Sequence, residues 1–307
     1  MNLHRLLLGI LGCLVIAGCG GSGSAAAPAF RHIVIADGSN NRIVSVDNIL
    51  GTNWIPFGSL GAGNNQFHNP TGLAFDSAGR IYICDFFNDR IVRIDDINGT
   101  NWTPFGTTGS GNNQFSQPYK IAIDGSDRIY VTDSGNNRVV RFDDMNGTNW
   151  VPLGTTGSGT NQFSTPIGIA VSGTGQIYVT DFGNHRVVRF DNMVGLNWTP
   201  FGTTGTGTGQ FSAAVDISLD LLGHMLVTDR NGRLIQTDQM SIAGWTEFAT
   251  STPQSADYGA GKIYFIDQSV SKLTRINSIL GAGLLTFGSA GAGMNQFSSP
   301  VAVRVQP

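Results

Sequence analysis

The chain has 307 residues, and 21 Asp and Glu residues against 18 Lys and Arg give it a formal net charge of −3 at pH 7. The basic residues form no run, so nucleic acid and anionic lipid headgroups are poor candidates as partners. The low charge and the Gly-rich segments, which draw on 42 glycines, fit an extracellular protein with exposed loops.

Residues 1–18 are predicted to be a lipoprotein signal peptide. Arg5 gives a short positive start, and the apolar residues 6–16 are too few to span a bilayer. The sequence Ile16-Ala17-Gly18-Cys19 resembles the bacterial lipobox, in which the cysteine becomes lipidated and forms the new N-terminus. The resemblance implies a lipid anchor on Cys19. The alternative is an ordinary signal peptide with an incidental cysteine.

Residues 19–29 are predicted to be the lipidated cysteine and a flexible tether, because this run is uncharged and has no apolar pattern. In the lipoproteins that it resembles, an Asp after the cysteine favours the inner membrane of Gram-negative bacteria. Gly20 stands there, which implies the outer membrane in such a host. We therefore expect a lipid-anchored protein of the bacterial cell envelope. Cys84 has no partner for an internal disulfide and is expected to be buried as a small apolar residue.

After the tether the sequence repeats itself every 48 residues. Gln-Phe pairs recur after Gly-rich runs, and an Asp closes an apolar run at the same spacing. The pairs begin at Gln66, Gln114, Gln162 and Gln210, and the acidic residues are Asp37, Asp85, Asp133, Asp181 and Asp229, followed by Asp267. A fixed period in the forties is typical of propeller blades.

One repeat contains four predicted strands. Residues 70–76 begin with a proline, as the first strand of a blade would. Residues 80–85 are rich in β-branched and aromatic residues, as in a buried strand. Residues 90–95 alternate in polarity, and Asn98-Gly99 predicts a tight hairpin turn before a short fourth strand at 102–106. Four antiparallel strands per repeat are typical of a propeller blade.

The six Asp landmarks predict six blades. The sequence ends with a first strand at 296–305 that has no second strand after it, and it begins with a second strand at 32–37 that has no first strand before it. We therefore predict an all-β, six-bladed β-propeller over residues 30–307. Its ring is closed by the C-terminal strand, which joins the N-terminal blade and leaves no open edge.

The strand motifs resemble the NHL repeat. They read Pro-x-Gly-Ile-Ala-Val, Gly-x-Ile-Tyr-Val-Thr-Asp and Asn-x-Arg-Val-Val-Arg-Phe, with the clearest copy at 177–190. The resemblance covers residues 30–307. It is strong at 70–202 and weaker beyond, where the turn at 229–233 is one residue short and Lys272 replaces the Arg. It implies a six-bladed propeller that serves as an interaction platform, and it does not by itself imply an activity.

Two repeated sets of residues are interpreted as structural. Asp, Asn and Arg recur in the turn between second and third strands, where the Asp caps its turn and the Arg satisfies carboxylates or carbonyls between blades. The tryptophans are interpreted as blade packing rather than a sugar platform. The two sets are Asp37/Asn40/Arg42, Asp85/Asn88/Arg90, Asp133/Asn136/Arg138 and Asp181/Asn184/Arg186, and Trp54, Trp102, Trp150, Trp198 and Trp245.

Function is expected where the repeats disagree. Near the start of the innermost strands the aligned residues are Gly72, Lys120, Gly168, Asp216, approximately Gln254, and Ala302. Lys120 and Asp216 replace small residues there, and we expect them at the mouth of the central channel. Other residues predicted on this face complete a mixed aromatic and charged binding surface: Tyr119, Phe86, Phe87, Phe182, His185 and His68. The alternative is that the charges are solvated and the phenylalanines pack against adjacent turns.

A catalytic alternative follows from a resemblance to six-bladed enzymes. Gluconolactonase-like hydrolases, virginiamycin B lyase and the lyase that completes peptide amidation place a divalent metal in the channel. Here Glu247 is the one Glu and is assigned to an outermost strand. No metal site is predicted, although Asp216 is a weak candidate ligand for Ca²⁺, with His68 or His185 as the base. No nucleophile stands apart from the repeat.

The sequence therefore favours a membrane-anchored, exported lipoprotein with no cofactor. Its propeller is expected to be a non-catalytic binding platform for a protein, peptide or glycan. A metal-dependent propeller lyase or lactonase and a passive structural component of an envelope assembly are the alternatives.

Overall fold

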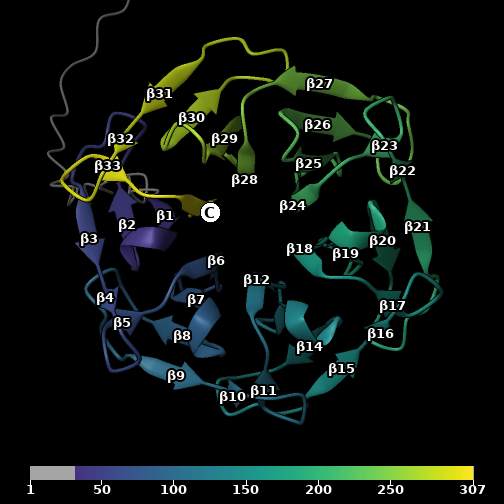
Figure 1. Ribbon diagram of the computed structural model, residues 1–307, viewed down its shortest axis with the longest axis horizontal. Coiled ribbons are helices and arrows are strands. Elements are labelled where there is room, and N and C mark those ends of the chain that lie inside the picture. Colours follow the sequence, from purple (N-terminus) through teal and green to yellow (C-terminus); the bar gives the residue numbers. More distant parts are fainter. Residues whose placement is uncertain (1–31, 307) are drawn as a thin grey trace, which may run out of the picture. The chain divides into compact units, whose positions relative to one another are not determined.

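The computed structural model describes residues 32–306, which form a ring of six blades around a central channel (Figure 1). Each blade is a four-stranded antiparallel sheet, which confirms the predicted all-β, six-bladed propeller. The predicted signal peptide and the tether with Cys19 lie outside the described residues. No helix of residues 32–306 is long and apolar enough to span a membrane.

In each blade the first strand lines the channel and the fourth lies at the outside of the ring (Figure 1). Blade 1 consists of β34 (Pro300–Val305), β1 (Ile33–Asp37), β2 (Arg42–Val46) and β3 (Ile55–Phe57). Blade 2 consists of β6 (Pro70–Phe75), β7 (Ile81–Asp85), β8 (Arg90–Ile94) and β9 (Thr103–Phe105). Blade 3 consists of β12 (Pro118–Ile123), β13 (Ile129–Asp133), β14 (Arg138–Phe142) and β15 (Val151–Leu153).

The remaining blades follow the same order. Blade 4 consists of β18 (Pro166–Val171), β19 (Ile177–Asp181), β20 (Arg186–Phe190) and β21 (Thr199–Phe201). Blade 5 consists of β24 (Ala214–Leu219), β25 (Met225–Asp229), β26 (Arg233–Thr237) and β27 (Thr246–Ala249). Blade 6 consists of β28 (Pro253–Gly259), β29 (Lys262–Asp267), β30 (Lys272–Ile276) and β31 (Leu285–Phe287).

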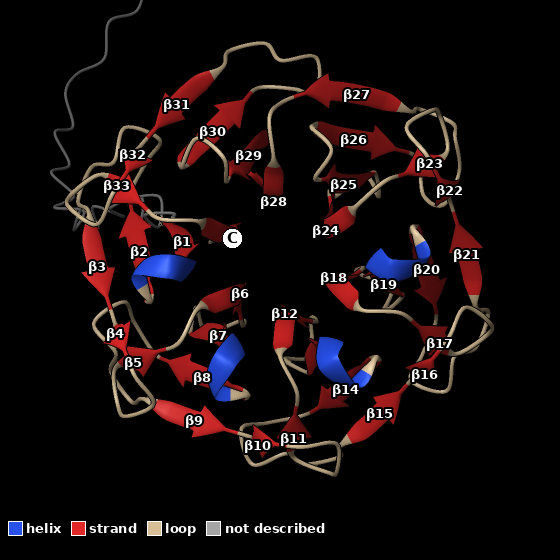
Figure 2. Cartoon of the chain, viewed as in Figure 1, coloured by secondary structure: helices blue, strands red, loops and turns tan. Residues whose placement is uncertain are grey.

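The links between blades and the turns within them contain further short strands and helices. Five links contain a parallel pair of two-residue strands: β4 (Ser59–Leu60) with β5 (Gln66–Phe67), β10 (Thr107–Thr108) with β11 (Gln114–Phe115), β16 (Thr155–Thr156) with β17 (Gln162–Phe163), β22 (Thr203–Thr204) with β23 (Gln210–Phe211), and β32 (Ser289–Ala290) with β33 (Gln296–Phe297). Four 3₁₀ helices follow the second strands of blades 1 to 4: η1 (Gly38–Asn40), η2 (Phe86–Asn88), η3 (Ser134–Asn136) and η4 (Phe182–Asn184). They gather around the channel on one side of the ring, called here the η face (Figure 2).

Blade 1 is assembled from both ends of the described chain. β34 pairs antiparallel with β1, with Val305 opposite Ile33 and Val303 opposite Ile35. This confirms the predicted ring closure, and it pairs β1, the second strand of blade 1, on both of its edges.

The repeated Asp, Asn and Arg residues join each turn to the preceding link. In blade 2, Asp85 accepts hydrogen bonds from Asn88 Nδ2 at 2.8 Å, Arg90 Nε at 2.7 Å and the backbone N–H of His68 at 2.6 Å. Arg90 also donates to the carbonyl of Gln66 at 2.9 Å. Equivalent bonds occur in blades 1, 3 and 4, which supports the structural interpretation of this set. The expectation that each Asp caps its own turn is wrong, because none of these carboxylates makes a cap hydrogen bond to the 3₁₀ helix that follows it; each accepts instead from a backbone N–H of the preceding link.

The tryptophans pack inside the blades, as interpreted from the sequence. Trp102 lies 5.2 Å from Phe67 between ring centroids, and the guanidinium of Arg90 lies 5.7 Å from the centroid of the Trp102 ring. The corresponding Trp–Phe centroid distances in the other repeats run from 5.1 to 5.7 Å. Cys84, on β7, is fully buried as expected, and burial raises the pKa of its thiol.

Candidate functional site

The first strands contribute two layers of side chains to the channel. The first layer consists of Gly72, Lys120, Gly168, Asp216, Ser255 and Ala302, and the second layer, two residues further on, of Ala74, Ala122, Ala170, Ser218, Asp257 and Arg304. In blade 6 the first-layer residue is Ser255, not Gln254 as predicted. The reason is that β28 begins with Pro253 opposite Asp267, as β6 begins with Pro70 opposite Asp85.

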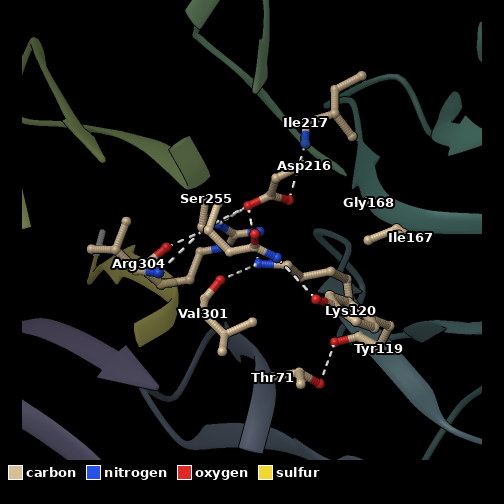
Figure 3. Close-up of polar contacts among 12 residues, drawn as sticks. Thr71, Tyr119, Lys120, Ile167, Gly168, Asp216, Ile217, Ser255, Val301 and Arg304 are labelled. Atoms are coloured by element: carbon tan, nitrogen blue, oxygen red, sulfur yellow. Dashed lines mark hydrogen bonds and ion pairs between the residues drawn. The ribbon is translucent and has the colours of Figure 1, made fainter. Parts of the chain in front are cut away.

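Lys120 and Asp216 form an ion pair across the channel (Figure 3). Lys120 extends from blade 3, and its Nζ lies 3.2 Å from Oδ2 of Asp216 in blade 5. The same Nζ donates to the backbone carbonyl of Val301 in blade 1 at 3.2 Å. Both charged side chains are 0% exposed. One lysine therefore connects three of the six blades.

Asp216 is held by further donors. Ser255 Oγ donates to its Oδ2 at 2.5 Å, and Arg304 Nη1 lies 3.4 Å from the same oxygen. Burial disfavours the ionised carboxylate, but the charges of Lys120 and Arg304 outweigh burial, so the pKa of Asp216 lies below its usual value. Burial lowers the pKa of Lys120 to about 8, although Asp216 opposes this shift. Each member of the pair therefore favours the charged form of the other.

The structure places Lys120 and Asp216 inside the channel rather than exposed at its mouth. Close approach of the first strands explains the difference from the prediction. A Cβ atom on Gly168 would lie 2.8 Å from the Cα of Asp216, and one on Gly72 would lie 2.9 Å from the Cα of Lys120. Because the strands leave no room beside them, the two charged side chains extend across the channel and meet.

Tyr119 and Gln254 make a second connection across the channel, nearer the η face. Gln254 Nε2 donates to the hydroxyl of Tyr119 at 2.9 Å, which joins blade 6 to blade 3 on the opposite side of the ring. The carbonyl of Tyr119 also accepts from Thr71 Oγ1 of blade 2 at 2.8 Å. Together with the ion pair of Lys120, this contact obstructs the channel from the η face.

Four of the predicted surface residues form one aromatic cluster on the η face. His68 lies 4.8 Å from Phe87, Phe87 lies 4.7 Å from Phe86, and Phe86 lies 5.5 Å from Tyr119, all measured between ring centroids. Phe87 is 51% exposed, and His68 is exposed as well. These four residues are called the aromatic cluster below. It spans blades 2 and 3.

The other two predicted residues, Phe182 and His185, lie in the turn of blade 4. His185 follows η4 with a left-handed backbone, φ 54°, and its Nδ1 lies 2.8 Å from the carbonyl oxygen of Ser212. Neither residue makes an aromatic contact with the aromatic cluster in the described structure. The structure therefore brings together four of the six predicted aromatic and histidine residues and leaves Phe182 and His185 apart.

The surroundings of Asp216 do not suit a divalent cation. Its Oδ2 already faces the positive charges of Lys120 and Arg304, which a metal ion would have to displace. Within residues 32–306, no three His, Cys, Asp or Glu side chains are placed to share a metal ion. His68 and His185, the candidate bases, make no hydrogen bond or ion pair with Asp216. Glu247, on the outer strand β27, pairs with Arg233 at 2.9 Å.

The second layer of the channel was not predicted from the sequence. Three blades carry alanine there, whereas blade 5 has Ser218, blade 6 has Asp257 and blade 1 has Arg304. The same comparison of repeats, moved two residues along the first strand, would have found these substitutions. The alignment of Asp257 and Arg304 with the other blades is hard to see in the sequence, because blade 6 departs from the 48-residue period and blade 1 is split between the two ends of the described chain.

The ring of blades and the repeated strand motifs define a β-propeller. The model of the NHL repeat matches residues 115–142 and 163–190, which cover the three inner strands of blades 3 and 4. The chain is thus a six-bladed propeller that carries NHL repeats. No curated protein matches the sequence.

Solved structures show the same fold at low sequence identity. The crystal structure of a nidogen/laminin complex contains a chain with 16% identity and a TM-score of 0.69, covering 90% of this chain and 98% of that one. Virginiamycin B lyase from Staphylococcus aureus has 18% identity and a TM-score of 0.55, covering 76% of this chain and 73% of that one. A streptogramin B lyase has 15% identity and a TM-score of 0.55, covering 75% and 76%. At these identities the likeness concerns the fold alone.

Proposed function

We propose that this chain is an exported, lipid-anchored protein of the bacterial cell envelope whose propeller binds a protein or peptide partner without catalysis. The observation that carries the proposal is the aromatic cluster. Aromatic side chains that stand together on a rigid scaffold, partly exposed, are typical of the energetic centre of protein interfaces. The nidogen structure, described as a complex with laminin, supports a binding role for a ring of this kind.

The cluster arises where blade 2 departs from the repeat. Blade 3 has Ser116, Ser134 and Gly135 at the positions that His68, Phe86 and Phe87 occupy in blade 2. Packing of the blade does not require the aromatic residues, because blade 3 forms the same turn without them. Blade 4 also has a phenylalanine, Phe182, at the position of Phe86, but it has Ser164 and Gly183 in place of His68 and Phe87. The combination found in blade 2 is therefore better explained by a contact outside the ring.

The test transfers the residues of blade 3 to blade 2. The variant His68→Ser/Phe86→Ser/Phe87→Gly should fold and should lose a partner that the wild type captures by cross-linking on intact cells. A matched control, Leu222→Thr, replaces an exposed leucine between β24 and β25 with the residue that blade 4 has there, Thr174. The control should retain the partner. Equal cross-linking by the triple variant and the wild type would remove the aromatic cluster as the binding surface.

The two alternatives make different predictions. A metal-dependent lyase or lactonase requires a divalent ion bound stoichiometrically, and metal analysis of the purified chain after dialysis tests this. A passive structural component requires an assembly that fails when turns on either face are altered, including the control turn. A glycan ligand would appear as cross-linking that is abolished by soluble glycan and not by protease treatment of the cell surface.

A further inference from the structure

A pocket of ≈ 350 Å³ opens into the channel on the side away from the η face. Its walls are the C-terminal halves of the first strands, whereas η1 to η4 lie near their N-terminal ends. Lys120, Asp216, Tyr119 and Gln254 obstruct the channel beyond the pocket. The pocket is therefore accessible from one face, and it is separate from the aromatic cluster.

The mouth of the pocket is apolar all around. Each blade contributes one hydrophobic or aromatic side chain from the end of its first strand: Phe75, Ile123, Val171, Leu219, Tyr258 and Val305. Deeper in, Ala74, Ala122 and Ala170 of the second layer leave space in blades 2 to 4. This half of the pocket can receive a compact apolar group, because apolar surface removed from water stabilises binding.

The polar groups gather on the opposite half. Ser218, Asp257 and Arg304 come from the adjoining blades 5, 6 and 1 and all line the pocket. Ser218 is 6% exposed, and its Oγ has no hydrogen-bond partner among residues 32–306. A buried hydroxyl without a partner is costly, so a polar group of a ligand would relieve that cost.

Arg304 offers the strongest recognition group. Its Nη1 donates to the carbonyl of Val303 at 2.9 Å and lies 3.4 Å from Asp216 Oδ2. In the described part of the chain, its Nε and Nη2 donate to no acceptor. The Nε–Nη2 edge of a guanidinium matches the two oxygens of a carboxylate, which it binds with two parallel hydrogen bonds.

The charges around this edge leave room for an anion. Asp216 is matched by Lys120 at 3.2 Å, so Arg304 is not needed to neutralise it. Asp257 also lines the pocket, and its charge and that of Arg304 attract each other, but the two form no ion pair within residues 32–306. Asp257 Oδ2 accepts from the backbone N–H of Val305 at 2.9 Å, so the Nε–Nη2 edge of Arg304 stays free among the described residues. Arg304 thus presents a fixed positive charge beside apolar walls.

We propose that this pocket binds a small monocarboxylate with a compact apolar body, whose carboxylate lies on the Nε–Nη2 edge of Arg304 and whose apolar part packs against the alanines and the apolar mouth. The proposal goes beyond the binding role of the aromatic cluster, since it concerns the other face of the ring. The pocket volume limits the ligand to a short chain or a single ring.

The test uses hexanoate and benzoate as probes, and hexanamide as an uncharged control with the same carbon chain as hexanoate. Ligand-observed NMR on the purified full chain should detect both carboxylates at millimolar concentration, with hexanamide at least about tenfold weaker. No detectable binding of either carboxylate at that concentration would overturn the proposal. Equal binding of hexanoate and hexanamide would also overturn it, because Arg304 would then not be the recognition group.

Two variants locate the site. Arg304→Gln removes the charge and should weaken hexanoate binding at least about tenfold. Because this change also touches Asp216, Ala170→Leu provides a second variant, which fills the apolar half and leaves Arg304 unchanged. It should abolish binding of hexanoate, whereas Leu222→Thr, outside this pocket, should not change it. Unchanged binding to Ala170→Leu would overturn the proposal even if the Arg304 variant failed to fold.

Discussion

Lys120 Nζ and Asp216 Oδ2 lie 3.2 Å apart although the two residues belong to blades 3 and 5, on either side of the channel. The pair has no counterpart in the repeat, since other blades carry Gly72, Gly168 and Ala302 at this layer. Buried ion pairs are costly to desolvate, and what they most clearly provide is a fixed arrangement of the parts that they join. We expect this ion pair to fix the spacing of blades 1, 3 and 5 around the channel.

The two partners of this pair should be energetically coupled, so that removing both costs less than the two single changes added together. Asp216→Asn leaves the buried charges of Lys120 and Arg304 without their carboxylate and should lower the free energy of unfolding by about 3–5 kcal/mol. Lys120→Met should cost less, because Arg304 and Ser255 still contact Asp216. The double variant should cost less than the sum, with a coupling of about 1–3 kcal/mol. Urea unfolding of the wild type, the two single variants and the double variant measures this coupling.

The control for that cycle is the pair Arg128–Asp124, at 2.7 Å, in which the arginine side chain is 40% exposed and reaches solvent while the aspartate side chain is 4% exposed. Arg128→Gln and Asp124→Asn should show a coupling below about 1 kcal/mol, because solvent screens such pairs. A coupling at Lys120–Asp216 as small as that of the control would contradict the assigned role.

The glycines of the first layer should tolerate no side chain. Gly168→Ala places a Cβ atom 2.8 Å from the Cα of Asp216, a backbone atom that cannot move aside alone, so we expect a loss of about 1–3 kcal/mol. Gly173→Ala, in the turn of the same blade, meets nothing within 4 Å and should change stability by less than about 0.5 kcal/mol. Thermal unfolding distinguishes the two; similar melting temperatures would show that the inner strands are less tightly packed.

Asp257 should make stability depend on pH in mildly acid solution. Burial raises the pKa of Asp257 to about 6 from its ordinary 3.8. Between these values the folded chain binds more protons than the unfolded chain, so the contribution of Asp257 to the free energy of unfolding falls as pH rises. Asp257→Asn removes this effect, and its uncharged carbonyl can still accept from the N–H of Val305.

We therefore expect Asp257→Asn to be more stable than the wild type at about pH 7.5, by on the order of 1–2 kcal/mol, and nearly equal at about pH 4. Urea unfolding of both proteins at several pH values isolates this residue, because all other groups titrate in both. A difference that stays constant with pH would exclude a raised pKa at Asp257.

The repeated arginines should matter more than arginines elsewhere on the same strand. Arg186 contacts Asp181 at 2.8 Å and donates to the carbonyls of Ser158 at 2.7 Å and Gln162 at 3.0 Å. Arg186→Gln should therefore cost about 2–3 kcal/mol, since it leaves a buried carboxylate less satisfied. Arg189→Gln, three residues further along β20, should cost less than about 1 kcal/mol. Equal losses would show that the link is held by other contacts.

The sequence predicted the fold well because each 48-residue repeat corresponds to one blade. The positions of Pro70 and Asp85 mark the ends of paired strands, and the incomplete segments at the two ends predicted the closure of blade 1. The assignment of Gln254 was off by one residue because blade 6 departs from the period, so alignment by spacing alone could not place the start of β28.

The candidate site was predicted less completely. The repeat identified Lys120 and Asp216 as exceptions, but contacts between blades 3 and 5 depend on the width of the channel, which no local pattern encodes. The aromatic cluster of His68, Phe86, Phe87 and Tyr119 was expected on one face, and its contiguity became evident only from the ring. The pocket was missed because two of its polar residues, Asp257 and Arg304, belong to blade 6, which departs from the period, and to blade 1, which is split between two distant segments.

The pairing of β34 with β1 also sets an order of events in folding. Blades 2 to 6 each consist of consecutive segments, so each can form as soon as its own residues have been synthesised. Blade 1 must wait, because the partner of Ile33 is Val305, near the very end of the chain. Until that strand arrives, β1 exposes an unpaired edge, and the open ring is the species in which strands of two different molecules can exchange. We therefore expect the ring to be completed late in folding, at the step where exchange of strands between molecules is possible.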